Sequence, residues 1–457
     1  MATFFKPKRV HKKEYQTLTI DKHDHSGNGL CLNNQPIVVV SNALKGEKCE
    51  VKFTKQSKKV NFADVTKVLE SSEQRVLPFC QYYGQCGGCS LQHTNAKNGL
   101  ALKTQALQDY VAKNLNKSSN SIDPSVWDKP ILSDIDYDSF SSLETGYRRR
   151  IRLAIDARNK SSVKIGFRCA SSTKIVDIES CLVATRTINK CFSQIRTVLK
   201  QLPSISKVGH LVITQGDSHL QVALFVTHRL CEKSIGQLDQ LALAVNCEVL
   251  VKSKHAEAIA FNSDVKGEQG TVTIEDKPHV SLRIKSDHFL QVNKAVNQRM
   301  ISSVQEWLVP SRKDTLYDFF CGSGNFALSF ADQVFAVKGF EGIDEMVQIA
   351  TDNAQSIGRS NCQFSTMDLS SPDELKQLTF DENALVVLDP SREGAAALCQ
   401  FLANSGVERI VYVSCNPNSF VRDAEFLLPN YRLDKIKALD MFPFTKHIEL
   451  MALFIKQ

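Results

Sequence analysis

The stretch DTLYDFFCGSGNFALSFADQVFAVKGFE, residues 314–341, decides which fold this chain is expected to adopt. Its apolar runs predict strands over Asp314–Phe320 and Val334–Phe340, with a helix over Asn325–Ala331 between them. Glycines in the connecting loop let the backbone pass close to a ligand, and the N–H groups at the start of the helix face that ligand. Glu341, which ends the second strand, is placed to accept hydrogen bonds from ribose hydroxyls. The stretch therefore predicts a site for a nucleotide-type cofactor.

The spacing of the glycines narrows the choice of cofactor. Gly322 and Gly324 form a G-x-G pair, without the third glycine of the G-x-G-x-x-G loop that binds a pyrophosphate. A loop this short fits S-adenosylmethionine (SAM) better than a dinucleotide. A tight turn that binds nothing is the alternative interpretation of the loop alone.

Strands and helices continue to alternate after residue 341. Strands are expected over Cys362–Met367, Ala384–Asp389 and Arg409–Ser414, which favours a doubly wound parallel sheet of the α/β class. The carboxyl ends of parallel strands line one crevice. Four residues with suitable chemistry fall at such ends, namely Glu341, Asp368, Asp389 and Cys415. Asp368 is suited to bind an adenine amino group.

Cys415, in Ser414-Cys415-Asn416-Pro417, and Glu449, which ends Phe442–Glu449, predict a specific chemistry. C5 of a pyrimidine is a poor nucleophile, and a thiolate that adds to C6 converts the ring into an enolate that can accept a methyl group. A base must then remove the C5 proton so that the thiol can leave. A thiol at a strand end and a carboxylate shortly downstream are the two groups that this reaction needs.

Length and composition describe an ordinary cytoplasmic protein. The chain has 457 residues, enough for two to four domains, with 42% hydrophobic and 23% charged residues. No apolar run approaches the roughly 18–20 residues of a membrane span. No apolar segment of a signal peptide follows the basic residues of Met1–Val10.

The net charge of +7 lies entirely near the N-terminus. Residues 1–60 contain 12 Lys and Arg against 5 Asp and Glu, whereas the rest of the chain balances at 44 against 44. Short strands are expected over Tyr15–Ile20, Ile37–Val40 and Glu50–Phe53, in the manner of a small β-barrel. A basic barrel predicts an anionic partner, with a solubilising tail as the alternative.

Three cysteines in one glycine-rich loop predict a metal site. Cys80, Cys86 and Cys89 need a fourth thiolate to hold a [4Fe–4S] cluster, and the candidates are Cys181 and Cys169. Zinc is the alternative, although four-cysteine zinc sites usually show two C-x2-C pairs and one is present here. The loop precedes a segment of mixed strands and helices up to residue 288, which predicts a central α+β domain.

Arginines and aromatic residues suggest a nucleic-acid surface. Arg148, Arg150 and Arg152 are expected on one face of a strand, in position to contact phosphates, with Arg149 opposite. A target base must leave its stack before C6 can be attacked. Three aromatic residues are candidates to stack on bases or to pack in a core, namely Phe289, Phe442 and Phe444.

With these motifs in hand, the chain resembles the RNA 5-methyluridine methyltransferase family, and within it the iron–sulfur 23S rRNA (uracil-C5)-methyltransferases that carry a TRAM domain. The resemblance covers essentially the whole chain, and the barrel matches most loosely. It is carried by the cysteine loop and by Gly146–Arg152, Phe289–Asn293, Asp318–Phe326, Leu388–Arg392, Val413–Pro417 and Asp440–Glu449. Ser323 and Ser391 depart from the pattern, and both are small enough to be harmless.

The resemblance implies a role for each matched residue. Cys415 would be the nucleophile and Glu449 the base that removes the proton. SAM and the target base would lie among Gln291, Phe320, Asn325, Glu341, Asp368 and Asp389. A [4Fe–4S] cluster would be held by Cys80, Cys86, Cys89 and Cys181, because the family places the fourth cysteine after a strand such as Ile175–Ile178.

The resemblance also implies an architecture and partners. Residues 1–72 would form an OB-like barrel that binds RNA, residues 73–288 the central domain with the cluster, and residues 289–457 the Rossmann-like SAM-dependent catalytic domain. The expected partner is 23S rRNA, and we expect a monomer that binds neither DNA nor membranes.

Three other functions compete with this interpretation. A DNA cytosine-C5 methyltransferase usually has Pro before its nucleophile, whereas Ser414 precedes Cys415 here. A tRNA uracil methyltransferase usually lacks the basic barrel and the cysteine loop. A non-catalytic RNA-binding or assembly factor would not need both Cys415 and Glu449.

Overall fold

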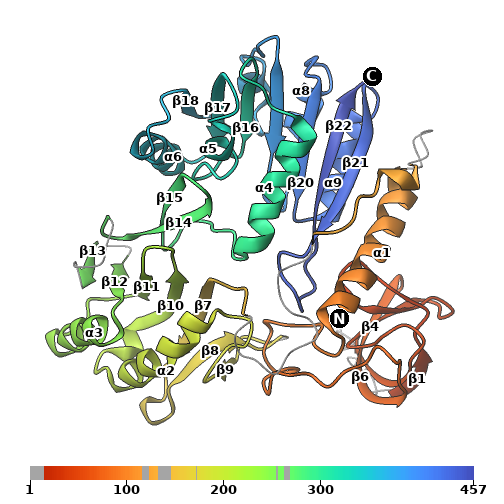
Figure 1. Cartoon of the computed structure of the whole chain (residues 1–457). Helices are drawn as coiled ribbons and strands as arrows, with labels where there is room; N and C mark the ends of the chain where they lie inside the picture. Colours follow the sequence, from red (N-terminus) through yellow and green to blue (C-terminus); the bar gives the residue numbers. More distant parts are fainter. Residues whose placement is uncertain (1–14, 116–122, 132–145, 171, 254–255, 262–267) are drawn as a thin grey trace, which may run out of the picture.

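The computed structural model describes residues 15–115, 123–131, 146–170, 172–253, 256–261 and 268–457. Its sheets form three bodies, which follow one another along the chain (Figure 1). The first part of the basic N-terminal segment, residues 1–14, lies outside the described residues, as does much of residues 118–142, a segment rich in Ser, Asp and Pro that the sequence suggests is a surface connection. In the part of the chain that is described, no helix is long and apolar enough to cross a membrane.

The N-terminal body is a six-stranded sheet in the order β1-β5-β6-β4-β3-β2. Alternating side chains such as Val38, Val40, Cys49 and Val51 fill its core, as the predicted strand pattern requires. Its strands are β1 (Tyr15–Thr19), β2 (Lys22–His23), β3 (Gly29–Cys31), β4 (Ile37–Ser41), β5 (Lys48–Lys55) and β6 (Val60–Glu70). Exposed lysines remain on the outside, namely Lys45, Lys48, Lys55, Lys58 and Lys59.

The central body is a seven-stranded sheet in the order β13-β12-β11-β10-β7-β8-β9. All its strand pairs are antiparallel except β11 with β12, so the predicted α+β character holds. The strands are β7 (Arg150–Asp156), β8 (Lys164–Arg168), β9 (Ile175–Asp177), β10 (Val208–Gln215), β11 (Leu220–Val226), β12 (Glu248–Ser253) and β13 (Ala256–Phe261). Helices α2 (Arg186–Gln201) and α3 (Glu232–Val245) pack against this sheet.

The C-terminal body is a seven-stranded sheet in the order β18-β17-β16-β19-β20-β22-β21. The first five strands are parallel, which confirms the predicted doubly wound sheet, and β22 pairs antiparallel with both neighbours. Its strands are β16 (Thr315–Phe319), β17 (Ala336–Glu341), β18 (Cys362–Thr366), β19 (Ala384–Leu388), β20 (Arg409–Ser414), β21 (Tyr431–Leu439) and β22 (Glu449–Lys456). Its helices are α4 (Lys294–Leu308), α5 (Ala327–Phe330), α6 (Asp344–Ser356), α7 (Pro372–Leu375), α8 (Ala396–Leu402) and α9 (Pro417–Leu427).

Two earlier segments pack into this C-terminal body. Helix α1 (Ala96–Leu115) runs from the barrel along the sheet beside α9 (Figure 1), and its Leu107 and Val111 belong to the core of the sheet. The hairpin of β14 (Thr271–Lys277) and β15 (Val280–Lys285) shares a small core with Leu328 of α5. The chain therefore crosses between bodies more often than the predicted boundaries at residues 72 and 288 suggest, and those boundaries remain predictions.

Candidate active site

The thiol and the carboxylate singled out from the sequence meet at one edge of the C-terminal sheet. Cys415 directly follows β20, and Glu449 is the first residue of β22. The antiparallel ladder between these strands runs from the pair Arg409 and Ile455 to the pair Ser414 and Leu450, so its next step brings Cys415 opposite Glu449. Directly opposed residues point to the same face of a sheet. The two groups that uracil methylation needs are therefore neighbours.

Burial shapes the electrostatics of this pair. It raises the pKa of Glu449 to about 8, with a further contribution from the negative charge of Asp389. Burial also raises the pKa of the Cys415 thiol, and the charges of Glu449 and Asp389 raise it further, while Arg392 opposes them. Because the groups interact, a proton held on Glu449 favours the thiolate of Cys415.

The other predicted residues lie along the same edge, in the order of the strands. Phe320 follows β16, Glu341 ends β17 and Asp389 follows β19. Burial raises the pKa of Asp389 to about 7. Asp368 lies two residues beyond β18 and is exposed, with Oδ1 accepting hydrogen bonds from the backbone N–H and the hydroxyl of Ser370. The sheet therefore gathers all four predicted strand-end residues at one edge.

Three residues of the glycine-rich loop have unusual backbone conformations. Phe320, Gly322 and Gly324 all have positive φ, of 63°, 54° and 96°. Glu341 fixes the loop from the neighbouring strand by accepting a hydrogen bond of 3.1 Å from the N–H of Gly322. Left-handed φ is easily adopted by glycine and is uncommon for Phe320, so the surroundings hold this residue in place.

Asn325, at the end of this loop, is held by a buried polar network. Its side-chain amide exchanges two hydrogen bonds, of 3.0 and 3.1 Å, with the amide of Asn297 on α4. Asn297 also donates to Asp276 at 2.6 Å, and Asp276 forms a two-pronged ion pair with Arg149 at 2.6 Å on each arm. Arg149 further donates to the backbone carbonyl of Gln291 at 2.9 Å. The network therefore ties a strand of the central domain to two predicted cofactor residues.

The predicted arginine surface is wrong in part. Arg149, predicted on the face away from the phosphate contacts, is buried in an ion pair with Asp276 and does not contradict the prediction. Arg150 is also used internally, since its guanidinium donates to Thr214 and to the backbone carbonyls of His288 and Lys285. Arg152 is exposed, and Arg148 lies 5.9 Å from the ring centroid of Phe442. Arg149 and Arg150 are used internally because their segment runs between the central and C-terminal bodies. Backbone carbonyls there accept hydrogen bonds from their guanidinium groups.

The aromatic candidates separate in the same way. Phe444 is buried with its ring 5.0 Å from that of Phe79, whereas Phe289 is 69% exposed. Phe444 is therefore a packing residue, and Phe289 is accessible to a bound base.

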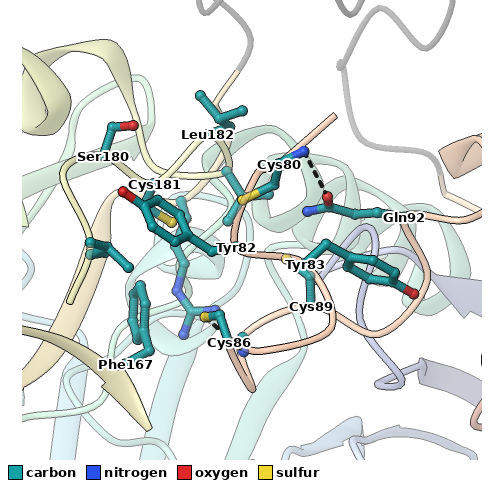
Figure 2. Close-up of a pocket in the computed structure, with 14 residues that line it drawn as sticks. Cys80, Tyr82, Tyr83, Cys86, Cys89, Gln92, Phe167, Ser180, Cys181 and Leu182 are labelled. Carbon is teal, nitrogen blue, oxygen red and sulfur yellow. Dashed lines mark hydrogen bonds between the residues drawn. The ribbon is translucent and has the colours of Figure 1, made fainter. Parts of the chain in front are cut away.

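The predicted cluster ligands line a single cavity beside the barrel. Figure 2 shows Cys80, Cys86 and Cys89 on one loop, with Cys181 facing them from the segment after β9. Cys169 does not line this cavity, although its backbone pairs with that of Cys86. Apolar and aromatic side chains complete the wall, among them Tyr82, Phe167, Ile178, Leu182 and Val183. In the described segments, no three His, Cys, Asp or Glu side chains converge on a point that could hold a metal ion.

Two further residues of the site were not selected from the sequence. Asp318 is fully buried inside β16, where burial raises its pKa to about 8 and the charges of Asp389 and Glu341 raise it further. An acid inside an apolar strand is visible in the sequence and could have been selected. Asn297 has no such mark, because its role depends on the packing of α4 against the loop. Cys321 is buried in the loop, where it serves packing.

This sheet, its glycine-rich loop and the thiol–carboxylate pair at its edge place the protein among Rossmann-like, SAM-dependent methyltransferases. The family model described as tRNA (Uracil-5-)-methyltransferase matches residues 129–457. The chain belongs to this family.

Relatives with specific names extend over the full length. The chain is similar to 23S rRNA (uracil(1939)-C(5))-methyltransferase RlmD of Vibrio cholerae, with 34% identity over 100% of both chains. It is also similar to the enzyme of that name from Shewanella piezotolerans, with 35% identity over 99% of both chains. The protein of the same name from Alteromonas mediterranea is 34% identical, over 96% of this chain and 87% of its own.

A solved structure supports the fold. The Pyrococcus abyssi tRNA (uracil-54, C5)-methyltransferase in complex with S-adenosyl-L-homocysteine aligns with a TM-score of 0.71. The alignment covers 96% of this chain and 99% of that chain at 23% identity. At this identity the similarity concerns the fold.

Proposed function

We propose that this protein methylates C5 of a specific uridine in 23S rRNA, with SAM as methyl donor. The observation that carries the proposal is the position of Cys415 opposite Glu449 at the edge that also holds the glycine-rich loop. The names of the full-length relatives support 23S rRNA as the substrate. A different rRNA uridine or a tRNA is the alternative substrate for the same chemistry.

Cys415 starts the proposed reaction. Its thiolate adds to C6 of the uracil ring, a C6–S bond forms, and the electron pair of the C5–C6 double bond becomes an enolate. Bound SAM would supply an electrophilic methyl group, and C5 would take it as the bond between this methyl group and the SAM sulfur breaks, with S-adenosyl-L-homocysteine as the leaving group. The proton on Glu449 at neutral pH lowers the negative charge beside Cys415 while the thiolate forms.

Glu449 completes the reaction. Once its own proton has passed to solvent, its carboxylate removes the proton from C5, and the electron pair of that C–H bond re-forms the C5–C6 double bond. The C6–S bond breaks at the same time, and Cys415 leaves as a thiolate. A raised pKa makes Glu449 a stronger base than an exposed carboxylate, which suits this step.

The cofactor would lie over the edge between β18 and β19. Glu341 would accept hydrogen bonds from the ribose and Asp368 from the adenine amino group, while Asn325 and Gln291 approach from the loop and from the segment before α4. Phe320 and Asp389 complete the set and lie closest to the target base. The hydrogen bond from the N–H of Gly322 to Glu341 supports this placement, because it holds the loop against the strand end that would bind the ribose.

We further propose that Cys80, Cys86, Cys89 and Cys181 hold a [4Fe–4S] cluster. The four thiols line one cavity, and the sequence holds only one C-x2-C pair, which favours an iron–sulfur cluster over a four-cysteine zinc site. Apolar residues in the cavity wall, such as Phe167 and Ile178, would shield such a cluster from water, and Arg148 and Gln92 line the same wall. The membership of Cys181 in this wall favours it over Cys169 as fourth ligand.

The basic barrel of residues 1–72 would supply RNA affinity, since phosphate contacts from lysines bind RNA without reading its sequence. We expect the protein to act in the cytoplasm as a monomer, without DNA or membrane partners.

Two measurements test the function. Mass spectrometric mapping of 23S rRNA from a deletion strain should reveal the loss of 5-methyluridine at one position, restored by wild type and not by Cys415→Ala. RNA that contains 5-fluorouridine at this position should trap the wild-type enzyme covalently, because fluorine cannot leave C5 as a proton does. Trapping of Cys415→Ala at the wild-type level would refute the assignment of the nucleophile.

A further inference from the structure

The segment that leads into Glu449 is an irregular loop between β21 and β22. It runs from Asp440 to Ile448, and most of its residues are buried. Phe444, in its middle, has a φ of 64°, in the left-handed region that a residue with a side chain rarely adopts. Such a conformation persists when the surroundings hold it in place. The position of Glu449 therefore depends on the residues that form contacts with this loop.

The most extensive contacts with this loop come from Lys103 on helix α1. Its ammonium group donates one hydrogen bond of 3.1 Å to the carbonyl of Thr445 and one of 2.8 Å to the carbonyl of His447. Asp440, at the start of the loop, balances its charge at 3.8 Å. One side chain therefore binds both the beginning of the loop and two residues, Thr445 and His447, that lie shortly before Glu449.

Lys103 occupies an unusual place for a lysine. Along α1 the buried face includes Leu100, Leu107 and Val111, and Lys103 stands within this face at 1% exposure. Burial lowers the pKa of its ammonium group, and the charge of Asp440 opposes this effect. An apolar residue at this position would fill the space without the cost of burying a charge. The lysine is therefore explained by the carbonyls that it binds.

A second set of hydrogen bonds to this loop comes from the cysteine loop and from Tyr147. The N–H groups of Ser90 and Leu91 both donate to the carbonyl of Phe444, at 2.9 Å each. The hydroxyl of Tyr147 donates to the carbonyl of Pro443 at 3.2 Å. These three donor residues and the helix of Lys103 lie in the chain far before the catalytic sheet, as Figure 1 shows for α1.

We propose that Lys103 is a positioning residue for the reaction, which holds Glu449 where it can remove the C5 proton. The inference rests on the proposed function and adds a residue that lies outside the segment matched by the family model, residues 129–457. It assigns to the N-terminal part of the chain a share in proton removal, in addition to RNA affinity.

Loss of Lys103 should therefore impair only one step of the reaction, the removal of the C5 proton by Glu449. Without Lys103 the loop loses two hydrogen bonds and Glu449 moves relative to C5, whereas Cys415, on a different strand, stays in place. A displacement of about 1 Å can slow a chemical step on the order of 100-fold. The covalent RNA–enzyme adduct should then accumulate on natural RNA, as it should when Glu449 itself is changed to Gln.

Three variants test the inference at saturating RNA and SAM. Lys103→Met removes the charge and the donors at similar length, and Lys103→Gln keeps N–H donors without the charge. The matched control is Lys97→Met, since Lys97 is an exposed lysine on the same helix. We expect turnover to fall on the order of 100-fold in Lys103→Met, less in Lys103→Gln, and to stay at the wild-type rate in Lys97→Met.

The readout that separates positioning from folding is the adduct. Denaturing gels of reactions with natural RNA should show adduct in Lys103→Met and none in wild type, while trapping by 5-fluorouridine RNA stays at the wild-type rate. Combined with Glu449→Gln, Lys103→Met should cause little additional loss, because both changes impair the same step. If Lys103→Met does not fold, the same measurements on Lys103→Gln test the positioning role. Amide hydrogen exchange over residues 442–449 should then be faster in Lys103→Gln than in wild type.

Other outcomes would overturn the inference. A parallel fall in trapping and in turnover would mean that Lys103 supports the fold in general. If the double variant Lys103→Met, Glu449→Gln loses turnover by the product of the two single losses, Lys103 acts in a step other than proton removal. If wild type is not trapped by 5-fluorouridine RNA at all, the proposed function fails; if wild type and Glu449→Gln behave as expected and the Lys103 variants form no adduct, only the positioning role fails.

Discussion

Cys415 directly follows β20 and Glu449 begins β22, so both lie one step beyond the last paired residues of these strands, Ser414 and Leu450. Thirty-four positions separate them in the chain, and the antiparallel return of β22 brings them together. The geometry joins a nucleophile and a base without a flexible loop on the nucleophile's side.

Glu449→Gln should stabilise the protein, and more at pH 8 than at pH 5. Burial raises the pKa of Glu449 from 4.5 to about 8, so unfolding releases a proton between these pH values and the stability of wild type falls as pH rises through this range. Glutamine does not titrate, so its advantage should grow to the order of a few kcal/mol at pH 8. Thermal unfolding of both proteins at pH 5 and pH 8 measures it.

The exposed Glu425 on α9 provides the control for this prediction, since Glu425→Gln should shift the melting temperature little at either pH. An advantage of Glu449→Gln that is the same at pH 5 and pH 8 would contradict a raised pKa.

Asn297→Ala should weaken SAM binding more than it slows the reaction. The change removes the amide that pairs with Asn325 and with Asp276, so the buried network loses its centre. Loss of a buried hydrogen bond costs about 1–3 kcal/mol, and we expect KM for SAM to rise about tenfold or more with a smaller change in kcat.

Gln298→Ala is the neighbouring control, because Gln298 is exposed on the same helix. A fall in kcat with an unchanged KM for SAM would argue that the network serves the target base and not the cofactor.

Cys181→Ser should abolish the iron–sulfur cluster, and Cys169→Ser should leave it in place. Cys181 lines the same cavity as the three loop cysteines, whereas Cys169 does not. Anaerobically purified wild type should be brown and contain about four irons per chain, as expected for a cubane on four thiolates. Iron analysis and the visible absorption spectrum measure the difference. Stoichiometric zinc without iron in wild type would favour the alternative metal.

Replacing Lys55, Lys58 and Lys59 of the barrel by Ala should weaken RNA binding and reduce its dependence on salt. These lysines are exposed at the turn between β5 and β6, and each phosphate contact that is lost reduces the slope of log K against log salt by about 0.7. Binding titrations at several salt concentrations should therefore give a slope that is smaller by about 2.

Point variants are preferable to removal of the barrel, because Glu47 of the barrel is buried in an ion pair with Arg75. Arg312→Ala with Lys313→Ala is the control on the catalytic domain, where both side chains are exposed. An equal loss of slope in this control would mean that RNA contacts are spread over the surface.

The sequence by itself determined the class of the C-terminal domain and most residues of its edge. Apolar runs separated by a glycine-rich loop predict parallel strands, and strand ends in such a sheet converge, so Glu341, Asp389 and Cys415 could be grouped before any coordinates. Local spacing also selected the three cysteines of one loop, because a short loop limits where their thiols can point.

Tertiary structure alone decided the contacts between segments that are far apart in the chain. The register of β22 opposite β20, the burial of Arg149 against Asp276, and the grip of Lys103 on the loop before Glu449 all join residues more than 30 positions apart. No local pattern encodes such pairs, because hydrophobic periodicity states which face of an element is buried and not which partner covers it. A lysine in an apolar stripe has meaning only once the carbonyls that it binds are in place.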